Sequence, residues 1–105
     1  MESDKRFAAR KQISIDIIVN YELDYTGLWK TRDLSLNGVL IEMPPQDLPP
    51  SAEVEAILAL SNHGHLEQHH VPAQVVRVAP SGVALMFRDY ENRTYAALAK
   101  LLHAE

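Results

Sequence analysis

Residues 71–87 read VPAQVVRVAPSGVALMF, and this stretch decides the fold that the chain is expected to adopt. Within residues 71–79, Val71, Ala73, Val75 and Arg77 alternate with the residues between them, and this period of two predicts a strand. Pro72 must lie near the start of this strand or at a sheet edge, because proline donates no hydrogen bond to a ladder. Residues 80–82 (PSG) suit a tight turn, and residues 83–87 form a second apolar run. The stretch therefore predicts an antiparallel hairpin.

The same alternation occurs upstream. Residues 12–22 read QISIDIIVNYE, in which isoleucine recurs at every second position until the phase slips at Ile18. This pattern predicts a half-buried strand with a bulge or a change of face at that residue. Further strands are expected at residues 28–32, 39–43 and 54–60, with turns at residues 24–27, 37–38 and 61–64.

The last segment changes from a strand period to a helical one. Tyr95, Leu98, Leu101 and Leu102 recur at helical spacing among alanines, and Asp89 before them is a candidate N-cap. The pattern predicts a helix of roughly 12 residues. Its apolar stripe is expected to pack against the rest of its own chain.

About six short strands joined by tight turns leave little room for crossover helices. Such strands favour antiparallel pairing and a small closed barrel, which removes most exposed edges. The expected fold is mainly all-β: a six-stranded antiparallel barrel with a C-terminal α-helix from about residue 90 that covers one end.

Composition narrows the possible functions. The 105 residues suffice for one domain with one core, and 47% hydrophobic with 23% charged residues makes intrinsic disorder unexpected. The chain has no cysteine, which excludes a disulfide framework, a thiolate nucleophile and a cysteine-based zinc site. No apolar run approaches the ~20 residues that span a bilayer, and no signal peptide is visible. We therefore expect a cytoplasmic protein without membrane insertion.

Charge is distributed unevenly along the chain. Residues 1–12 carry four basic and two acidic side chains, whereas residues 13–105 carry six basic and twelve acidic ones. We therefore expect a flexible basic N-terminal arm over residues 1–11 and the barrel with its helix over residues 12–105. An acidic body is a poor binder of long nucleic acid, but the arm suits a small anion.

Two arginines, Arg6 and Arg10, lie four residues apart in the arm. This spacing places both on one side of a helix or of an extended strand. Each guanidinium presents a planar fork that binds phosphate oxygens and also matches the O6 and N7 edge of guanine. Taken alone, a basic arm of this kind is more often a solvated terminus.

A second polar pattern, DLSLNG, occupies residues 33–38. Alternation sends its two leucines inward and sends Asp33 and Ser35 to the other face. The carboxylate of Asp33 accepts hydrogen bonds from a purine N–H edge or an arginine, and the Ser35 hydroxyl can donate to a phosphate oxygen. Gly38 permits close approach of a ligand to the backbone. The alternative is a plain strand-ending turn in which the serine and asparagine side chains bond local backbone groups.

Together the two patterns resemble the signature of the PilZ domain family, which comprises bacterial receptors for cyclic di-GMP. The resemblance rests on Arg-x-x-x-Arg over residues 6–10, followed after one hairpin by Asp-x-Ser-x-x-Gly over residues 33–38. The runs at residues 75–78 and 82–87 resemble the strand pair that follows in that family. The resemblance covers nearly the whole chain and implies a six-stranded barrel with a C-terminal helix.

The resemblance also implies the roles of single residues. By position, Arg6 and Arg10 would clamp phosphate and the guanine edge. Asp33 and Ser35 would contact guanine and phosphate from the barrel face, and Gly38 would shape the loop.

The implied function is that of a stand-alone cyclic di-GMP receptor, which relays the signal by ligand-dependent contact with an unidentified protein effector. No cofactor is implied besides this ligand. Some family members carry another arginine just before the first one; here Lys5 occupies that position and is a further candidate contact with a point charge in place of a fork. The alternative is a PilZ-like adaptor that binds a protein and no nucleotide. Such relatives typically lack both motifs.

Other functions have weaker support. His63, His65, His69 and His70 cluster within eight residues, but no cysteine or carboxylate pattern completes a familiar metal site, so a polar loop is expected there. Ser35 has no histidine and aspartate partners at a recognisable spacing, and we expect no enzyme. One tryptophan and two phenylalanines in an acidic body argue against a stacking groove for single-stranded nucleic acid.

Overall fold

The computed structural model describes residues 11–22, 24–44 and 48–103. The hairpin predicted at residues 71–87 is present: the end of β5 pairs with β6 in antiparallel register, from Ala73 opposite Phe87 to Ala79 opposite Gly82. The elements in chain order are β1 (Asp16–Tyr21), β2 (Asp24–Leu34), β3 (Gly38–Glu42), β4 (Glu53–Asn62), β5 (His65–Ala79), β6 (Gly82–Phe87) and α1 (Asn92–Leu102).

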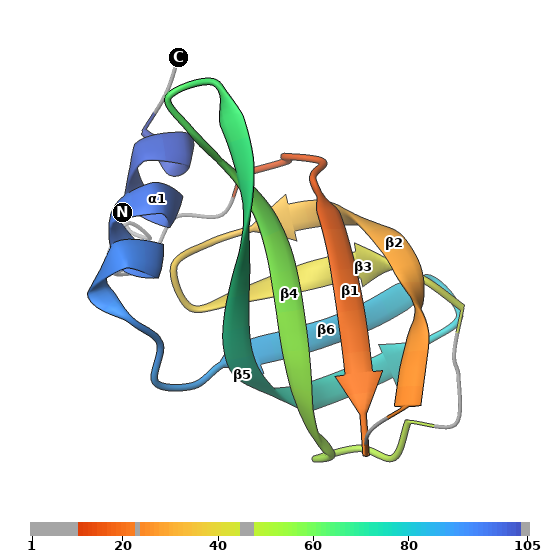
Figure 1. Cartoon of the computed structure of the whole chain (residues 1–105). Helices are drawn as coiled ribbons and strands as arrows, with labels where there is room; N and C mark the ends of the chain where they lie inside the picture. The colour runs from red at the N-terminus through yellow and green to blue at the C-terminus, as the bar shows by residue number, and fades with distance from the viewer. Residues whose placement is uncertain (1–10, 23, 45–47, 104–105) are drawn as a thin grey trace, which may run out of the picture.

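The six strands close into a barrel in the order β1-β2-β3-β6-β5-β4, and every neighbouring pair is antiparallel (Figure 1). Alternate side chains point inward and form the core, among them Ile17, Ile41, Leu58 and Val75, each at most 1% exposed. Helix α1 lies outside the barrel and packs against β4. The predicted six-stranded barrel with a C-terminal helix is confirmed.

Bulges interrupt three strand pairs. The register of β1 against β2 shifts between Ile18 and Asn20, where a bulge was expected, but the extra residue lies on β2, because two steps along β1 face three along β2. Ile17 and Val19 are both fully buried, so β1 keeps its alternation and the change of face predicted at Ile18 is wrong. An extra residue of this kind bends its strand and redirects the side chains beside it. Two further shifts do not show in the sequence pattern: they lie between Thr31 and Asp33 in β2 and between Val75 and Arg77 in β5.

The turn predicted at residues 24–27 is wrong. β2 begins at Asp24 and pairs with β1 from there onward, and the chain reverses earlier, at Glu22, whose φ is 51°. Gly27 lies inside β2 with φ 139°, where an added Cβ would stand 2.7 Å from the Trp29 ring. Pairing with β1 therefore overrides the local turn chemistry of these residues.

The β4–β5 hairpin is longer than predicted. Its turn consists of His63 and Gly64, whose φ angles of 52° and 86° fit a two-residue hairpin turn. β5 begins directly afterwards, at His65, well before the predicted start. His65, His69 and His70 therefore lie on a strand, and the polar loop expected for them is wrong.

Pro72 lies inside β5, opposite Glu55 of β4, and not near the start of the strand. On its other side the ladder with β6 begins one residue later, at Ala73. The carbonyl of Pro72 accepts a hydrogen bond of 2.8 Å from the Arg88 N–H, just past the end of β6. Because the N–H and C=O of one strand residue face the same neighbour, the missing donor faces a place where the ladder has ended. Pro72 is therefore paired with β4 on one side, and only on the β6 side does it lie at the end of a ladder, as the predicted edge position requires.

Helix α1 begins later than predicted. Its first residue is Asn92 and its N-cap is Glu91, which makes no side-chain capping hydrogen bond, so Asp89 is not the cap. Leu98 is fully buried, which confirms that the apolar stripe packs against the barrel, but Tyr95 is 50% exposed and lies outside that stripe. Within the described ranges, no helix is long and apolar enough to cross a membrane.

Candidate functional site

The chain reaches the barrel directly beside the second motif. The N–H of Lys11 donates to the carbonyl of Leu34 at 3.0 Å, and the N–H of Leu34 donates back to the carbonyl of Lys11 at 2.9 Å. Leu34 lies between Asp33 and Ser35, and Arg10 immediately precedes Lys11. The polypeptide that carries the first motif is therefore attached at the second one.

The residues of the first motif precede Lys11 in the chain. Arg6, Arg10 and Lys5 are outside the described residues. The prediction that they bind a ligand stays a prediction.

Asp33 is placed on the outer surface of the barrel. It is half-buried and pairs with Leu40 of β3, while its neighbour Leu34 is fully buried in the core. A bulge separates Asp33 from Thr31, and the residue between them, Arg32, is engaged elsewhere. The Arg32 guanidinium contacts Glu42 at 3.3 Å and the carbonyl of Ser81 at 3.2 Å. No arginine of the described residues competes for the Asp33 carboxylate.

Ser35 differs from the prediction, because its side chain is buried and turned back on its own loop. Its Oγ accepts hydrogen bonds from the N–H groups of Asn37 and Gly38, both at 3.1 Å. The same hydroxyl donates to the carbonyl of Gly38 at 3.3 Å. In this structure the serine therefore stabilises the turn, as the local-backbone alternative expects.

Gly38 is required by packing between strands. A Cβ at this position would lie 2.4 Å from the carbonyl oxygen of Leu85, a backbone atom of β6 that cannot move aside alone. The absence of a side chain thus lets β3 pair with β6 at the point where Gly38 faces Met86.

The loop of residues 35–37 is held from outside by the end of β6 and by the segment after it. The Phe87 N–H donates to the Asn37 carbonyl at 2.7 Å, and the Tyr90 hydroxyl donates to the Leu36 carbonyl, also at 2.7 Å. The rings of Phe87 and Tyr90 meet edge to face with centroids 6.0 Å apart. Sequence reasoning missed Tyr90, which lies 54 positions after its partner, and no local pattern signals that contact.

The histidines do not assemble into a metal centre. Across the described part of the chain, no group of three or more histidine, cysteine, aspartate or glutamate side chains could hold a metal ion. His70 contacts Glu55 at 3.0 Å, and this hydrogen bond is the main reason why the pKa of Glu55 lies below its ordinary value. His69 is buried, and its Nδ1 lies 2.8 Å from the Thr94 hydroxyl of α1.

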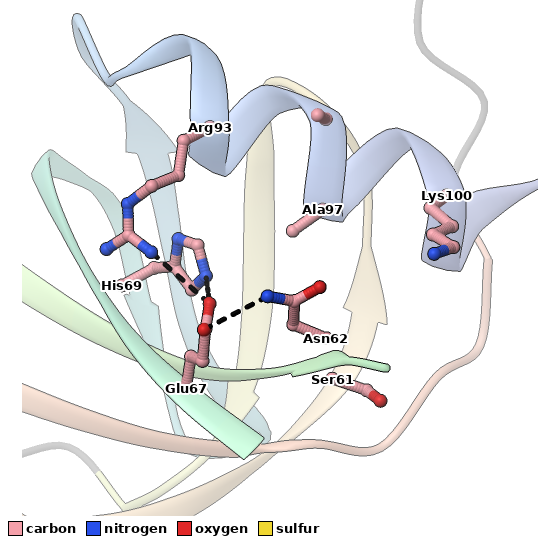
Figure 2. A pocket seen from close by; sticks show the side chains of 8 residues that line it. Ser61, Asn62, Glu67, His69, Arg93, Ala97 and Lys100 are labelled. Carbon is pink, nitrogen blue, oxygen red and sulfur yellow. Dashed lines mark hydrogen bonds and ion pairs between the residues drawn. The ribbon is translucent and has the colours of Figure 1, made fainter. Parts of the chain in front are cut away.

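A groove of about 460 Å³ separates the end of the β4–β5 hairpin from α1, and it shares no residue with either motif (Figure 2). The Glu67 carboxylate lies in it and accepts hydrogen bonds from Asn62 at 3.1 Å and from Arg93 at 3.2 Å. The Asn62 hydrogen bond is the largest of the effects that lower the pKa of Glu67. Nε2 of His69 points toward the same carboxylate at 3.6 Å, too far for a hydrogen bond.

Comparison with known proteins agrees with this architecture. The sequence profile of the PilZ domain matches residues 4–104, and the chain belongs to the PilZ domain family. The match includes Lys5, Arg6 and Arg10 as well as the whole barrel. PilZ domains are non-catalytic domains that serve as cyclic di-GMP receptors or as adaptors.

Two solved structures share the fold. The PilZ domain of CeSA from a cellulose-synthesizing bacterium aligns with a TM-score of 0.65 and 21% identity, over 89% of this chain and 93% of that one. The Bacillus subtilis inhibitor of motility MotI/DgrA aligns with a TM-score of 0.79 and 15% identity, over 92% of this chain and 48% of that one. No functionally curated protein gives a significant match.

Proposed function

We propose that this protein is a cyclic di-GMP receptor that binds its ligand between the N-terminal arm and the turn at residues 33–38. The observation that carries the proposal is the paired backbone of Lys11 and Leu34, which attaches the arm beside Asp33. Membership of the PilZ family supports the same ligand.

The chemistry of each motif residue suits one part of the ligand. Cyclic di-GMP carries two phosphates and two guanines. Arg6 and Arg10 offer planar forks to phosphate oxygens or to the O6 and N7 edge of guanine, and Lys5 adds a point charge. The outward carboxylate of Asp33 can accept from the N–H edge of a guanine.

Ser35 and Gly38 act through the turn. The hydrogen bond from the Ser35 hydroxyl to the Gly38 carbonyl is 3.3 Å long, whereas the two bonds that Oγ accepts are shorter. The proton can therefore rotate to a phosphate oxygen while Oγ keeps accepting from the turn. In this proposal Gly38 shapes the loop and lets it stay close to β6.

In this proposal the receptor relays the signal by contact with a protein effector. It is not an enzyme, it acts in the cytoplasm, and it uses no cofactor beyond its ligand. Closure of the arm over the nucleotide changes the shape and charge of the surface beside Asp33. The acidic body disfavours long nucleic acid as a partner. The alternative, an adaptor that binds no nucleotide, does not account for the presence of both complete motifs.

Calorimetric titration with cyclic di-GMP tests the proposal, with GTP as the comparison ligand. We expect saturable binding of cyclic di-GMP by the wild-type protein and none by Arg10→Ala. Arg93→Ala is the matched control, because it removes an exposed arginine from α1 and should leave the affinity unchanged. A folded wild-type protein that does not bind would favour the adaptor.

A further inference from the structure

We propose that Arg77 of β5 reads the second guanine of cyclic di-GMP, the one that Asp33 does not contact. This inference rests on the proposed function and extends its site from the turn of the second motif across the neighbouring strands. Neither motif includes Arg77.

The strand register puts Arg77 and Asp33 in one row on the outer face of the barrel. Asp33 pairs with Leu40, Leu40 pairs with Ala84, and Ala84 pairs with Arg77. The row therefore crosses β2, β3, β6 and β5, which are consecutive neighbours in the barrel (Figure 1). The side chains of this row point outward, because the next residues along β3 and β6, Val39 and Leu85, are buried in the core.

The bulge in β5 gives Arg77 this position. The register shifts between Val75 and Arg77, so that Val75 faces the core opposite Leu85 while Arg77 faces outward opposite Ala84. Without the extra residue, Val76, the side chain of residue 77 would follow that of residue 75 inward.

The Arg77 guanidinium also makes no ion pair with another described residue. Among the arginines of residues 11–22, 24–44 and 48–103, Arg32, Arg88 and Arg93 each contact a carboxylate. Arg77 is exposed and has no hydrogen bond or ion pair in that part of the chain. A planar fork with five donors is thus available to a ligand at this end of the row.

The surface between the two ends suits a flat ligand. Between the two ends lie Leu40, whose half-buried side chain offers an apolar surface, and Ala84, which carries only a methyl group. Gly38, two residues before Leu40 on the same face, carries no side chain, so a base can approach the strands closely there. Met86 lies opposite Gly38 and is 43% exposed, which offers an apolar, polarizable surface to a ring.

The spacing suits a ligand with two equal ends. Asp33 and Arg77 are separated by three strand steps, about 14 Å along the sheet, and the long arginine side chain shortens the gap. Cyclic di-GMP is two-fold symmetric and carries one guanine on each side of its ring. If the carboxylate of Asp33 takes the N–H edge of one guanine, the other guanine extends toward Arg77, whose fork matches O6 and N7.

Adenine provides the test, because it replaces the O6 acceptor with an amino donor. Wild type and Arg77→Ala would be titrated with cyclic di-GMP and with 3′,3′-cyclic GMP-AMP, which keeps one guanine for Asp33. We expect wild type to bind cyclic di-GMP about 10-fold more tightly than the mixed dinucleotide. Arg77→Ala should lose about 10-fold in affinity for cyclic di-GMP and bind both ligands equally.

Two control variants complete the experiment. Arg77→Lys keeps the charge without the fork and should discriminate as poorly as Arg77→Ala, and Arg93→Ala should behave as wild type. Unchanged affinity in Arg77→Ala, or an equal loss for both ligands, would overturn the role of Arg77 while leaving the receptor assignment intact. Failure of wild type to bind cyclic di-GMP at all would overturn the proposed function itself.

Discussion

The hydroxyl of Thr31 donates a hydrogen bond of 2.6 Å to the carbonyl of Ile13, and the same oxygen accepts one of 2.9 Å from the N–H of Ile15. Thr31 lies on β2 and is 1% exposed. A single buried side chain therefore fastens the segment that leads from the arm into β1.

Replacement of Thr31 by valine should loosen this segment. The change keeps the shape but leaves the Ile13 carbonyl and the Ile15 N–H without their partner, and we expect a loss of about 1–3 kcal/mol in the free energy of unfolding. Urea denaturation measures it. Thr31→Ser keeps the hydroxyl and should lose less; equal losses in the two variants would contradict a role for the hydrogen bonds.

Gly38→Ala should be destabilising for a different reason. Its Cβ would lie 2.4 Å from the Leu85 carbonyl oxygen, so β3 and β6 must separate locally, at an expected cost of about 1–3 kcal/mol. Gly64→Ala is the comparison, because no atom lies within 4 Å of its Cβ and only its φ of 86° opposes a side chain. If Gly64→Ala proved the more damaging in thermal denaturation, close packing would not be the reason for glycine at 38.

How far the sequence predicts this structure can be seen at the second motif. The period-two pattern predicts the strands and the barrel, and it places Leu34 in the core. It fails at Ser35, because β2 ends at Leu34 and the Ser35 side chain turns back into the loop that follows. The pattern also does not predict the bulge between Thr31 and Asp33. A bulge is set by pairing with another strand, so local alternation does not reveal it.

Contacts between residues far apart in the sequence are the second feature that the sequence pattern does not predict. Tyr90 holds Leu36 across 54 positions, and His69 meets Thr94 across 25. Both pairs bring α1 or the segment before it to the barrel, and the packing of that helix decides which side chains meet. The motif residues, by contrast, were identifiable because their types and spacing are local.

His69 should make stability fall on mild acidification. Burial, and next the positive charge of Arg93, lower the pKa of His69 in the folded protein, while Glu67 and Glu91 oppose the shift. The unfolded chain, with a histidine pKa of about 6.5, therefore takes up the proton more readily than the folded one. Stability is lost as the pH falls through that value, until the folded histidine is protonated too.

The measurement is the free energy of unfolding at pH 7.5 and 5.5 for wild type and His69→Gln. We expect the decrease between the two pH values to be smaller in the variant, whatever its stability at pH 7.5. The range avoids Glu55, whose lowered pKa contributes stability that is lost only at more acidic pH. An unchanged decrease in His69→Gln would show that other groups cause it.

Tyr90→Phe tests whether the rigidity of the motif turn matters for binding. The variant keeps the ring contact with Phe87 but removes the 2.7 Å hydrogen bond to Leu36, and we expect a loss of about 1 kcal/mol in stability. Cyclic di-GMP should bind several-fold more weakly, because the loop beside Asp33 must then be ordered by the ligand. Tyr95→Phe, at an exposed position of α1, should change neither quantity.

Ligand binding should protect the backbone where the arm meets the barrel. The hydrogen bonds between Lys11 and Leu34 lie at the end of the ladder and are expected to open more readily than those of the central strands. If arginines on the arm grip a ligand that Asp33 also contacts, opening must break these contacts as well. Amide exchange of Lys11 and Leu34 should therefore slow on addition of cyclic di-GMP, with Ala56 in the β1–β4 ladder as the unaffected reference. Unchanged exchange at both residues, measured at a saturating concentration, would remove closure of the arm from the mechanism.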